Sequence, residues 1–135
     1  MAESLRMSVE TLICDFYDAR ARGDRAAVRS MLADDVRWHD PYPPPHGGDL
    51  IGADTVLAQI VDAAGALTDG TTRLEPHAVA ADGVLAVVLV RWSATMRGRT
   101  LRGQEAAVYR VVDGRIAEAW FHPADPEASD AFFTA

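Results

Sequence analysis

Residues 84–122, VLAVVLVRWSATMRGRTLRGQEAAVYRVVDGRIAEAWFH, decide the fold class of this chain. Runs rich in β-branched and aromatic residues alternate in them with glycine-containing turns, which is typical of consecutive β-strands. Asp113-Gly114 is a strong signal for a type I′ hairpin, and Asp82-Gly83 is a further turn just before the stretch. With the run that precedes it, the stretch predicts an antiparallel meander of four strands, Thr72–Ala80, Val84–Met96, Thr100–Val112 and Arg115–His122.

The segment before the strands has the apolar spacing of helices. One face of a first helix carries apolar residues at the i, i+3, i+4, i+7 and i+8 positions, which are Val9, Leu12, Ile13, Phe16 and Tyr17. We expect Ser8 to be its N-cap and Gly23 to end it. Cys14 lies among these apolar positions, so we expect a core residue that forms no disulfide, because it is the only cysteine.

A second helix, a short strand and a third helix follow. Asp24 is a suitable cap for a helix that buries Val28, Met31 and Leu32 and ends at residues 34–35. Val36–His39 is then predicted as a short strand. Pro41–Asp49 is rich in proline and glycine, so we expect a rigid rim or a mobile lid there. A third helix is expected to begin after Gly52.

Helices followed by strands indicate an α+β fold in which the helices cover one face of the sheet. Long strands twist and coil strongly. We therefore predict one domain, residues 1–135, in which three N-terminal helices and a curved antiparallel sheet form a cone around an internal pocket.

Charge and composition exclude several classes of protein. The net charge is −7 and no Lys/Arg cluster suits a phosphate backbone, so we expect no nucleic-acid partner. The longest apolar run, Val84–Val90, is too short to cross a membrane, and no secretory signal is apparent, so we expect a cytoplasmic protein. Two arginine groups are interpreted as solvated, with an anionic ligand as the alternative for the second: Arg20, Arg22, Arg25 and Arg29, and Arg97, Arg99 and Arg102.

Four segments together resemble one known superfamily. They are FYDARARGD at residues 16–24, LADDVRWHDP at 32–41, Gly52 before the third helix, and VVDGRIAEAWFHP at 111–123. Their order is similar to that of nuclear-transport-factor-2-like proteins, in the ketosteroid-isomerase-like and SnoaL-like polyketide cyclase branch. The resemblance implies the conical α+β fold, and it places Asp40 where the isomerases keep a general base.

The same resemblance implies which strand residues face the pocket. It places Val88, Val90 and Trp92 inward on one strand, and Gly103, Glu105, Ala107 and Tyr109 inward on its neighbour. Strand alternation agrees, because each set lies on a single face. The oxyanion donors of the isomerases are missing, since Phe16 and Ala107 stand at the matching positions and Tyr17 lies about 100° around the helix from Phe16.

Three residues are candidate catalytic groups. Burial between tryptophans would raise the pKa of Asp40 toward a value suited to proton abstraction; the alternative is a turn cap before Pro41. Glu105 would be a second carboxyl group beside it, or else would pair with an arginine such as Arg91 or Arg115. Tyr109 would donate a hydrogen bond to a substrate oxygen, or else pack in the core. The predicted substrate-binding residues are Phe16, Tyr17, Trp38, Val88, Val90, Trp92 and Phe121.

The histidines do not form a metal site by their spacing, and we predict neither metal nor cofactor. His39 should point away from Asp40 by alternation, and His46 lies in the proline-rich loop. Glu118, Trp120 and His122 share the outer face of the sheet, which in the superfamily often forms a homodimer interface.

These features predict a cofactor-independent acid/base enzyme of isomerase, cyclase or dehydratase type. Its substrate would be a small hydrophobic carbonyl compound. The alternatives are a binding protein that holds an apolar small molecule without catalysis, and a dimerisation module whose cone is filled.

Overall fold

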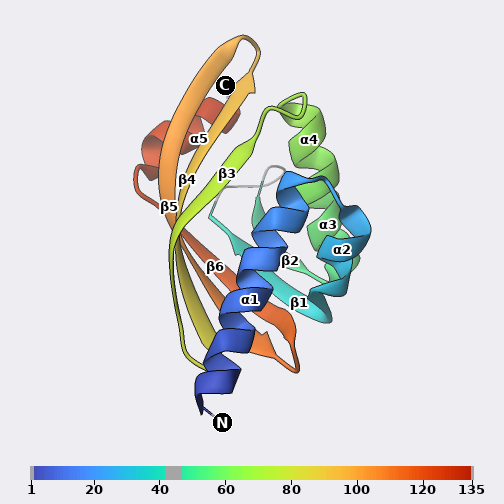
Figure 1. Cartoon of the computed structure of the whole chain (residues 1–135). Helices are drawn as coiled ribbons and strands as arrows, with labels where there is room; N and C mark the ends of the chain where they lie inside the picture. Colours follow the sequence, from blue (N-terminus) through green and yellow to red (C-terminus); the bar gives the residue numbers. More distant parts are fainter. Residues whose placement is uncertain (1, 42–46, 135) are drawn as a thin grey trace.

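The computed structural model describes residues 2–41 and 47–134. Five α-helical segments, a π-helical segment and six strands follow one another along the chain (Figure 1). They are α1 (Ala2–Ala21), α2 (Arg25–Ser30), β1 (Leu32–Asp40), β2 (Gly48–Ile51), α3 (Ala53–Leu57), η1 (Ala58–Ala63), α4 (Ala64–Leu67), β3 (Arg73–Ala81), β4 (Leu85–Met96), β5 (Arg99–Val112), β6 (Arg115–Pro123) and α5 (Pro126–Thr134).

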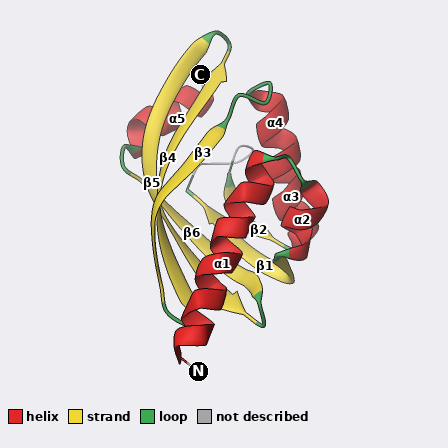
Figure 2. Ribbon diagram, viewed as in Figure 1, coloured by secondary structure: helices red, strands yellow, loops and turns green. Residues whose placement is uncertain are grey.

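The strands form one curved sheet in the order β2-β1-β6-β5-β4-β3. The predicted meander β3–β6 is confirmed, and every pair is antiparallel except β1 with β6. Helices α1 to α4 lie on one side of the sheet, and α5 lies on the other side of the β4–β5 hairpin from α4 (Figure 2). The α+β fold with a curved sheet wrapped by helices is therefore as the sequence predicts.

Alternation along β4 explains why the sheet has one buried face. The even-numbered side chains from Ala86 to Met96 are all buried, whereas the odd-numbered ones from Leu85 to Arg91 are exposed. The buried set packs under the helices, since an alternating apolar strand places one face on the core and the other in solvent. Glu105, Ala107 and Tyr109 occupy the matching face of β5.

The helix boundaries differ from the sequence prediction. Ser8 is exposed within α1, which already begins at Ala2, so Ser8 is not its N-cap. Cys14 is exposed instead of buried, because the helix turns it away from the sheet. Asp24 does cap α2, with its carboxylate accepting a hydrogen bond from the Ala27 amide. Among helices of the described residues, none is long and apolar enough to cross a membrane.

The short first strand is longer than predicted. β1 begins at Leu32 because Leu32 pairs with Ile116 of β6, and the Ile116 amide donates to the Met31 carbonyl. Helix α2 therefore ends at Ser30, before the residues expected to close it. Strand β2 pairs with residues 37–40 and was not predicted, nor was α5. Residues 42–46, including His46, lie outside the described part.

Five aromatic side chains join α1 to the sheet. Phe16 of α1 contacts Trp38 and Tyr109, and Tyr17 contacts Tyr109. Phe121 packs against Trp38 and Tyr109, and the ring centroids of the cluster are 4.8–6.1 Å apart. The hydroxyl oxygens of Tyr17 and Tyr109 lie 2.6 Å apart in this cluster, so each buried phenol has a hydrogen-bond partner. Phe16, Tyr17 and Tyr109, which the sequence predicted to face the pocket, thus pack against other aromatic rings of the core.

Trp92 and Gly103 face each other across β4 and β5. A Cβ atom added to Gly103 would lie 2.6 Å from two carbon atoms of the Trp92 indole. Glycine is therefore required here by the space that the indole occupies.

We expect Gly103→Ala to destabilise the fold by about 1–3 kcal/mol, the usual cost of overpacking a core. The midpoint of urea unfolding measures it. Trp92→Phe combined with Gly103→Ala is the control, because the smaller ring leaves room for the methyl group. An unchanged midpoint in Gly103→Ala would contradict the tight packing of the pair.

Candidate functional site

A pocket of about 150 Å³ lies between the sheet and the helical segments. Its polar lining comes from four residues of four different elements or connections, Arg20, Asp40, Thr72 and Glu105. Its apolar lining includes Trp38, Ile60, Leu74, Trp92 and Phe121. Three ionisable side chains thus share a small pocket whose walls are largely aromatic and aliphatic.

Asp40 and Glu105 both line this pocket, as the sequence analysis expected. Asp40 is the last residue of β1, two positions after Trp38, so alternation turns both toward the helices. Glu105 lies on β5 between its register partners Val90 and Pro123. Burial raises the pKa of Glu105, and the charge of Asp40 raises it further. The two carboxyl groups are therefore electrostatically coupled.

Arg20 is the residue of this site that the sequence analysis did not identify. It lies in the last turn of α1, and its guanidinium carbon is 5.6 Å from the ring centre of Phe16. Its positive charge lowers the pKa of Glu105, against the effect of burial. Helical spacing could have identified it, because Arg20 follows Phe16 by four residues and so lies on the same inward face of α1.

The alternative pairing of Glu105 with Arg91 or Arg115 is not observed. Arg91 is exposed on the opposite face of β4, and Arg115 lines a separate groove with Asp34 and Asp35. The arginine whose charge acts on Glu105 is Arg20.

The structure places Tyr109 and Tyr17 in the core and not on the pocket wall. Tyr109 is fully buried, and its hydroxyl group is bonded to that of Tyr17. Burial raises the pKa of Tyr17 to about 12 and that of Tyr109 well above its ordinary value. This position agrees with core packing, the alternative that the sequence left open for Tyr109, and does not fit a direct hydrogen bond from Tyr109 to a substrate.

The predicted substrate-binding residues divide into two groups. Trp38, Trp92 and Phe121 line the pocket. Phe16, Tyr17, Val88 and Val90 do not, because they are buried in the core cluster that joins α1 to the sheet. The pocket is consequently shallower than the sequence analysis expected.

His39 faces away from the pocket, as predicted from alternation. Its Nε2 atom is 2.7 Å from a Glu118 carboxylate oxygen, and its Nδ1 atom is 3.0 Å from Asp49. The ring stacks on Trp120 at 5.7 Å between centroids. Hydrogen bonds to Glu118 and Asp49 raise the pKa of His39. Within the described residues no group of three or more His, Cys, Asp or Glu side chains is arranged to hold a metal ion.

Comparison with known proteins shows both a family and a fold. The SnoaL-like domain family matches residues 13–119. An uncharacterized protein of Mycobacterium tuberculosis is 36% identical over 119 residues, which cover 87% of this chain and 89% of that protein.

Two solved structures share this fold over most of the chain. Bal32a, from a soil-derived mobile gene cassette, superposes with a TM-score of 0.90 at 24% identity and covers 96% of this chain and 98% of its own. A putative ketosteroid isomerase from Kribbella flavida superposes with a TM-score of 0.72 at 20% identity and covers 89% of this chain and 80% of its own. At these identities the likeness concerns the fold alone.

Because the pKa of Glu105 is raised in the folded state, its ionisation should lower the stability of the protein, and this effect should depend on pH. A carboxyl group with a raised pKa in the folded state favours folding at low pH, and this contribution is lost as the pH rises through the folded pKa. We therefore expect Glu105→Gln to be more stable than the parent at pH 8, with the difference vanishing below the ordinary value of 4.5. Urea unfolding at several pH values measures it.

Glu118→Gln is the control of opposite sign. Hydrogen bonds from His39 and Arg110 lower the pKa of Glu118, so its contribution to stability is present above 4.5 and is lost on acidification. A stability difference for Glu105→Gln that did not vary with pH would contradict the desolvated environment of Glu105.

Proposed function

We propose that this chain, which belongs to the SnoaL-like domain family, is a cofactor-independent enzyme that moves protons on a small hydrophobic carbonyl compound. Isomerisation, ring closure and elimination of water are the reaction types that fit. The observation that carries the proposal is the meeting of Asp40, Glu105 and Arg20 in one pocket with aromatic walls.

The two carboxyl groups suit different roles. Asp40 would act as the general base and remove a proton from the carbon next to the carbonyl group. Glu105 would act in its protonated form, favoured by burial and by the charge of Asp40, and donate its proton to the carbonyl oxygen as the enol forms. Return of a proton from Asp40 to a different carbon, while the enol hydroxyl gives its proton back to Glu105, would complete a double-bond shift. Neighbouring carboxyl groups with separated pKa values commonly divide the work in this way.

Arg20 would stabilise the developing negative charge on the substrate oxygen. Phe16 and Ala107 supply no hydrogen-bond donor, and the Tyr109 hydroxyl is held in the core by Tyr17. Arg20 lines the pocket, and its guanidinium group carries N–H donors. A guanidinium in a site of low water content stabilises an oxyanion more strongly than it does in bulk water.

The pocket supports a substrate of modest size. Its volume of about 150 Å³ matches that of an engineered protein cavity that binds benzene. Trp38, Trp92 and Phe121 offer flat apolar surfaces to a ring. We therefore propose that the reacting part of the substrate is a single ring, or a chain of similar bulk, that carries the carbonyl group.

Proton abstraction can be tested without knowing the final product. We expect the protein in D₂O to speed deuterium incorporation next to the carbonyl group of small cyclic ketones and enones, followed by NMR. Asp40→Asn should lower the rate by about 10²–10⁴-fold, the usual contribution of a general base. Asp113→Asn is the matched control, because Asp113 lies in a turn far along the chain and asparagine tolerates its φ of 52°.

Two results would overturn this assignment. Equal exchange rates in Asp40→Asn and the parent would remove Asp40 from the reaction. Saturable binding of the ketones with no exchange above the buffer rate would favour the alternative of a non-catalytic binding protein.

We also propose that two copies pair through the outer face of the sheet. Leu85, Val87 and Leu89 remain 42–43% exposed there, beside Val108 and Trp120 on the neighbouring strands. Such a contiguous apolar strip on a sheet commonly marks an interface. Pairing about a twofold axis would bring the strip against its own copy.

Light scattering tests the pairing. We expect about twice the chain mass of 14.6 kDa for the parent, and the mass of one chain for Val87→Arg. Ile51→Arg is the control, since Ile51 is 61% exposed on β2, outside the strip. A single-chain mass for the parent at micromolar concentration would refute the proposal.

A further inference from the structure

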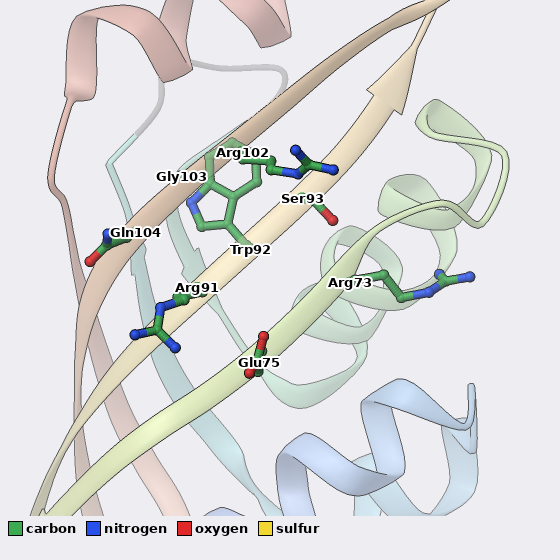
Figure 3. A pocket seen from close by; sticks show the side chains of 8 residues that line it. All are labelled: Arg73, Glu75, Arg91, Trp92, Ser93, Arg102, Gly103 and Gln104. Atoms are coloured by element: carbon green, nitrogen blue, oxygen red, sulfur yellow. The ribbon is translucent and has the colours of Figure 1, made fainter.

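A second hollow, with a volume of about 310 Å³, lies on the outer face of β3, β4 and β5 (Figure 3). Two cross-strand rows line it, Arg73–Ser93–Arg102 and Glu75–Arg91–Gln104. The members of each row are register neighbours and lie on the face opposite the pocket of Asp40. We call this hollow the outer groove. It is on the half of β4 nearer the turn at Arg97, beyond the apolar strip.

The outer groove is positively charged although the chain is acidic. Three arginines stand against the single carboxylate of Glu75, in a chain whose net charge is −7. The groove near Arg115 is different, because there Arg37, Arg110 and Arg115 are balanced by Asp34, Asp35 and Asp113. Excess positive charge in a hollow attracts anions.

Two of the arginines keep their donors available. Within residues 2–41 and 47–134, neither Arg91 nor Arg102 makes an ion pair or a side-chain hydrogen bond, whereas Arg73 donates to the carbonyl oxygens of Gly70 and Thr72. Arg91 and Arg102 are diagonal neighbours across β4 and β5. Their guanidinium groups point in different directions in Figure 3, so both side chains would turn toward a shared ligand, which their length allows. Ser93 and Gln104 add neutral hydrogen-bonding groups between them.

Trp92 borders the outer groove, although its side chain belongs to the buried inner face of β4. Gly103 has no side chain, and Figure 3 shows the indole of Trp92 beside it. Trp92 lines both the outer groove and the pocket of Asp40.

We propose that the outer groove binds a small oxyanion, a carboxylate or a phosphate, through Arg91 and Arg102. The inference is independent of the proposed catalysis, because it uses the other face of the sheet. Guanidinium groups suit both anions, since they present paired N–H donors to two oxygens at once.

An NMR titration of ¹⁵N-labelled protein tests this site, with phenyl phosphate and benzoate as separate probes and benzyl alcohol as the neutral control. We expect saturable shifts at Arg91, Arg102 and Gln104 with a Kd of about 1 mM or tighter for at least one anion. Which anion binds more tightly distinguishes the phosphate from the carboxylate. Benzyl alcohol should leave these signals unchanged.

Matched variants locate the binding. Arg91→Gln with Arg102→Gln should weaken the anion by about tenfold or more, as expected for the loss of hydrogen bonds to a charged ligand. Arg37→Gln with Arg115→Gln removes the same charge outside the outer groove. This double variant should change the affinity for the anion less than about twofold, because Arg91 and Arg102 contact the anion directly and distant charges are screened.

Three results would overturn the proposal. They are the absence of saturable shifts for both anions, an equal loss in the two double variants, and binding that is abolished by Arg20→Gln but kept without Arg91 and Arg102. The last would assign the anion to the inner pocket.

Discussion

The hydrogen bond between the hydroxyl groups of Tyr17 and Tyr109, 2.6 Å apart in the core, is the contact on which the rest of this structure depends. It joins the first helix to the central strand β5 at a point without exposure to water, where an unpaired phenol would be costly. The rings of Phe16, Trp38 and Phe121 pack around it. These contacts fix the position of α1 on the sheet. The position of α1 in turn limits how far the pocket extends into the core.

Filling the core with aromatic rings leaves only the outer part of the enclosed space for a ligand. The polar groups that remain are those at the ends of the elements: Arg20 in the last turn of α1 and Asp40 at the end of β1. Glu105 completes the set from the middle of β5, between Ala107 and Gly103, over which the Trp92 indole lies. The proposed chemistry of this chain thus depends on a few charged residues at a boundary between packed core and solvent, where burial is sufficient to shift the pKa of Glu105 but access remains.

Sequence patterns predicted the four long strands. The family resemblance implied the inward face of Glu105 and Trp92, and alternation agreed with it, because a period of two residues places the members of each set on one face. The family resemblance, and not the periodicity, implied that Asp40 lies in the pocket. Neither could decide between substrate contact and core packing for Tyr109, since its hydroxyl partner Tyr17 is 92 residues away and alternation does not show how deep a side chain lies. Strand β2 was missed because its four residues pair only through a contact with β1 that follows a proline-rich loop. Arg20 was interpreted as a solvated residue, since an arginine at a helix end usually is.

The central claim is that Glu105 is a desolvated carboxyl group under the opposing charges of Asp40 and Arg20. A ¹³C NMR titration of the chain labelled at its glutamate carboxyl carbons measures this directly, with Glu105→Gln to assign the signal. We predict a pKa for Glu105 above the ordinary value of 4.5, which falls in Asp40→Asn and rises further in Arg20→Gln. A Glu105 signal that titrates at the ordinary value, and that neither variant moves, would contradict the account.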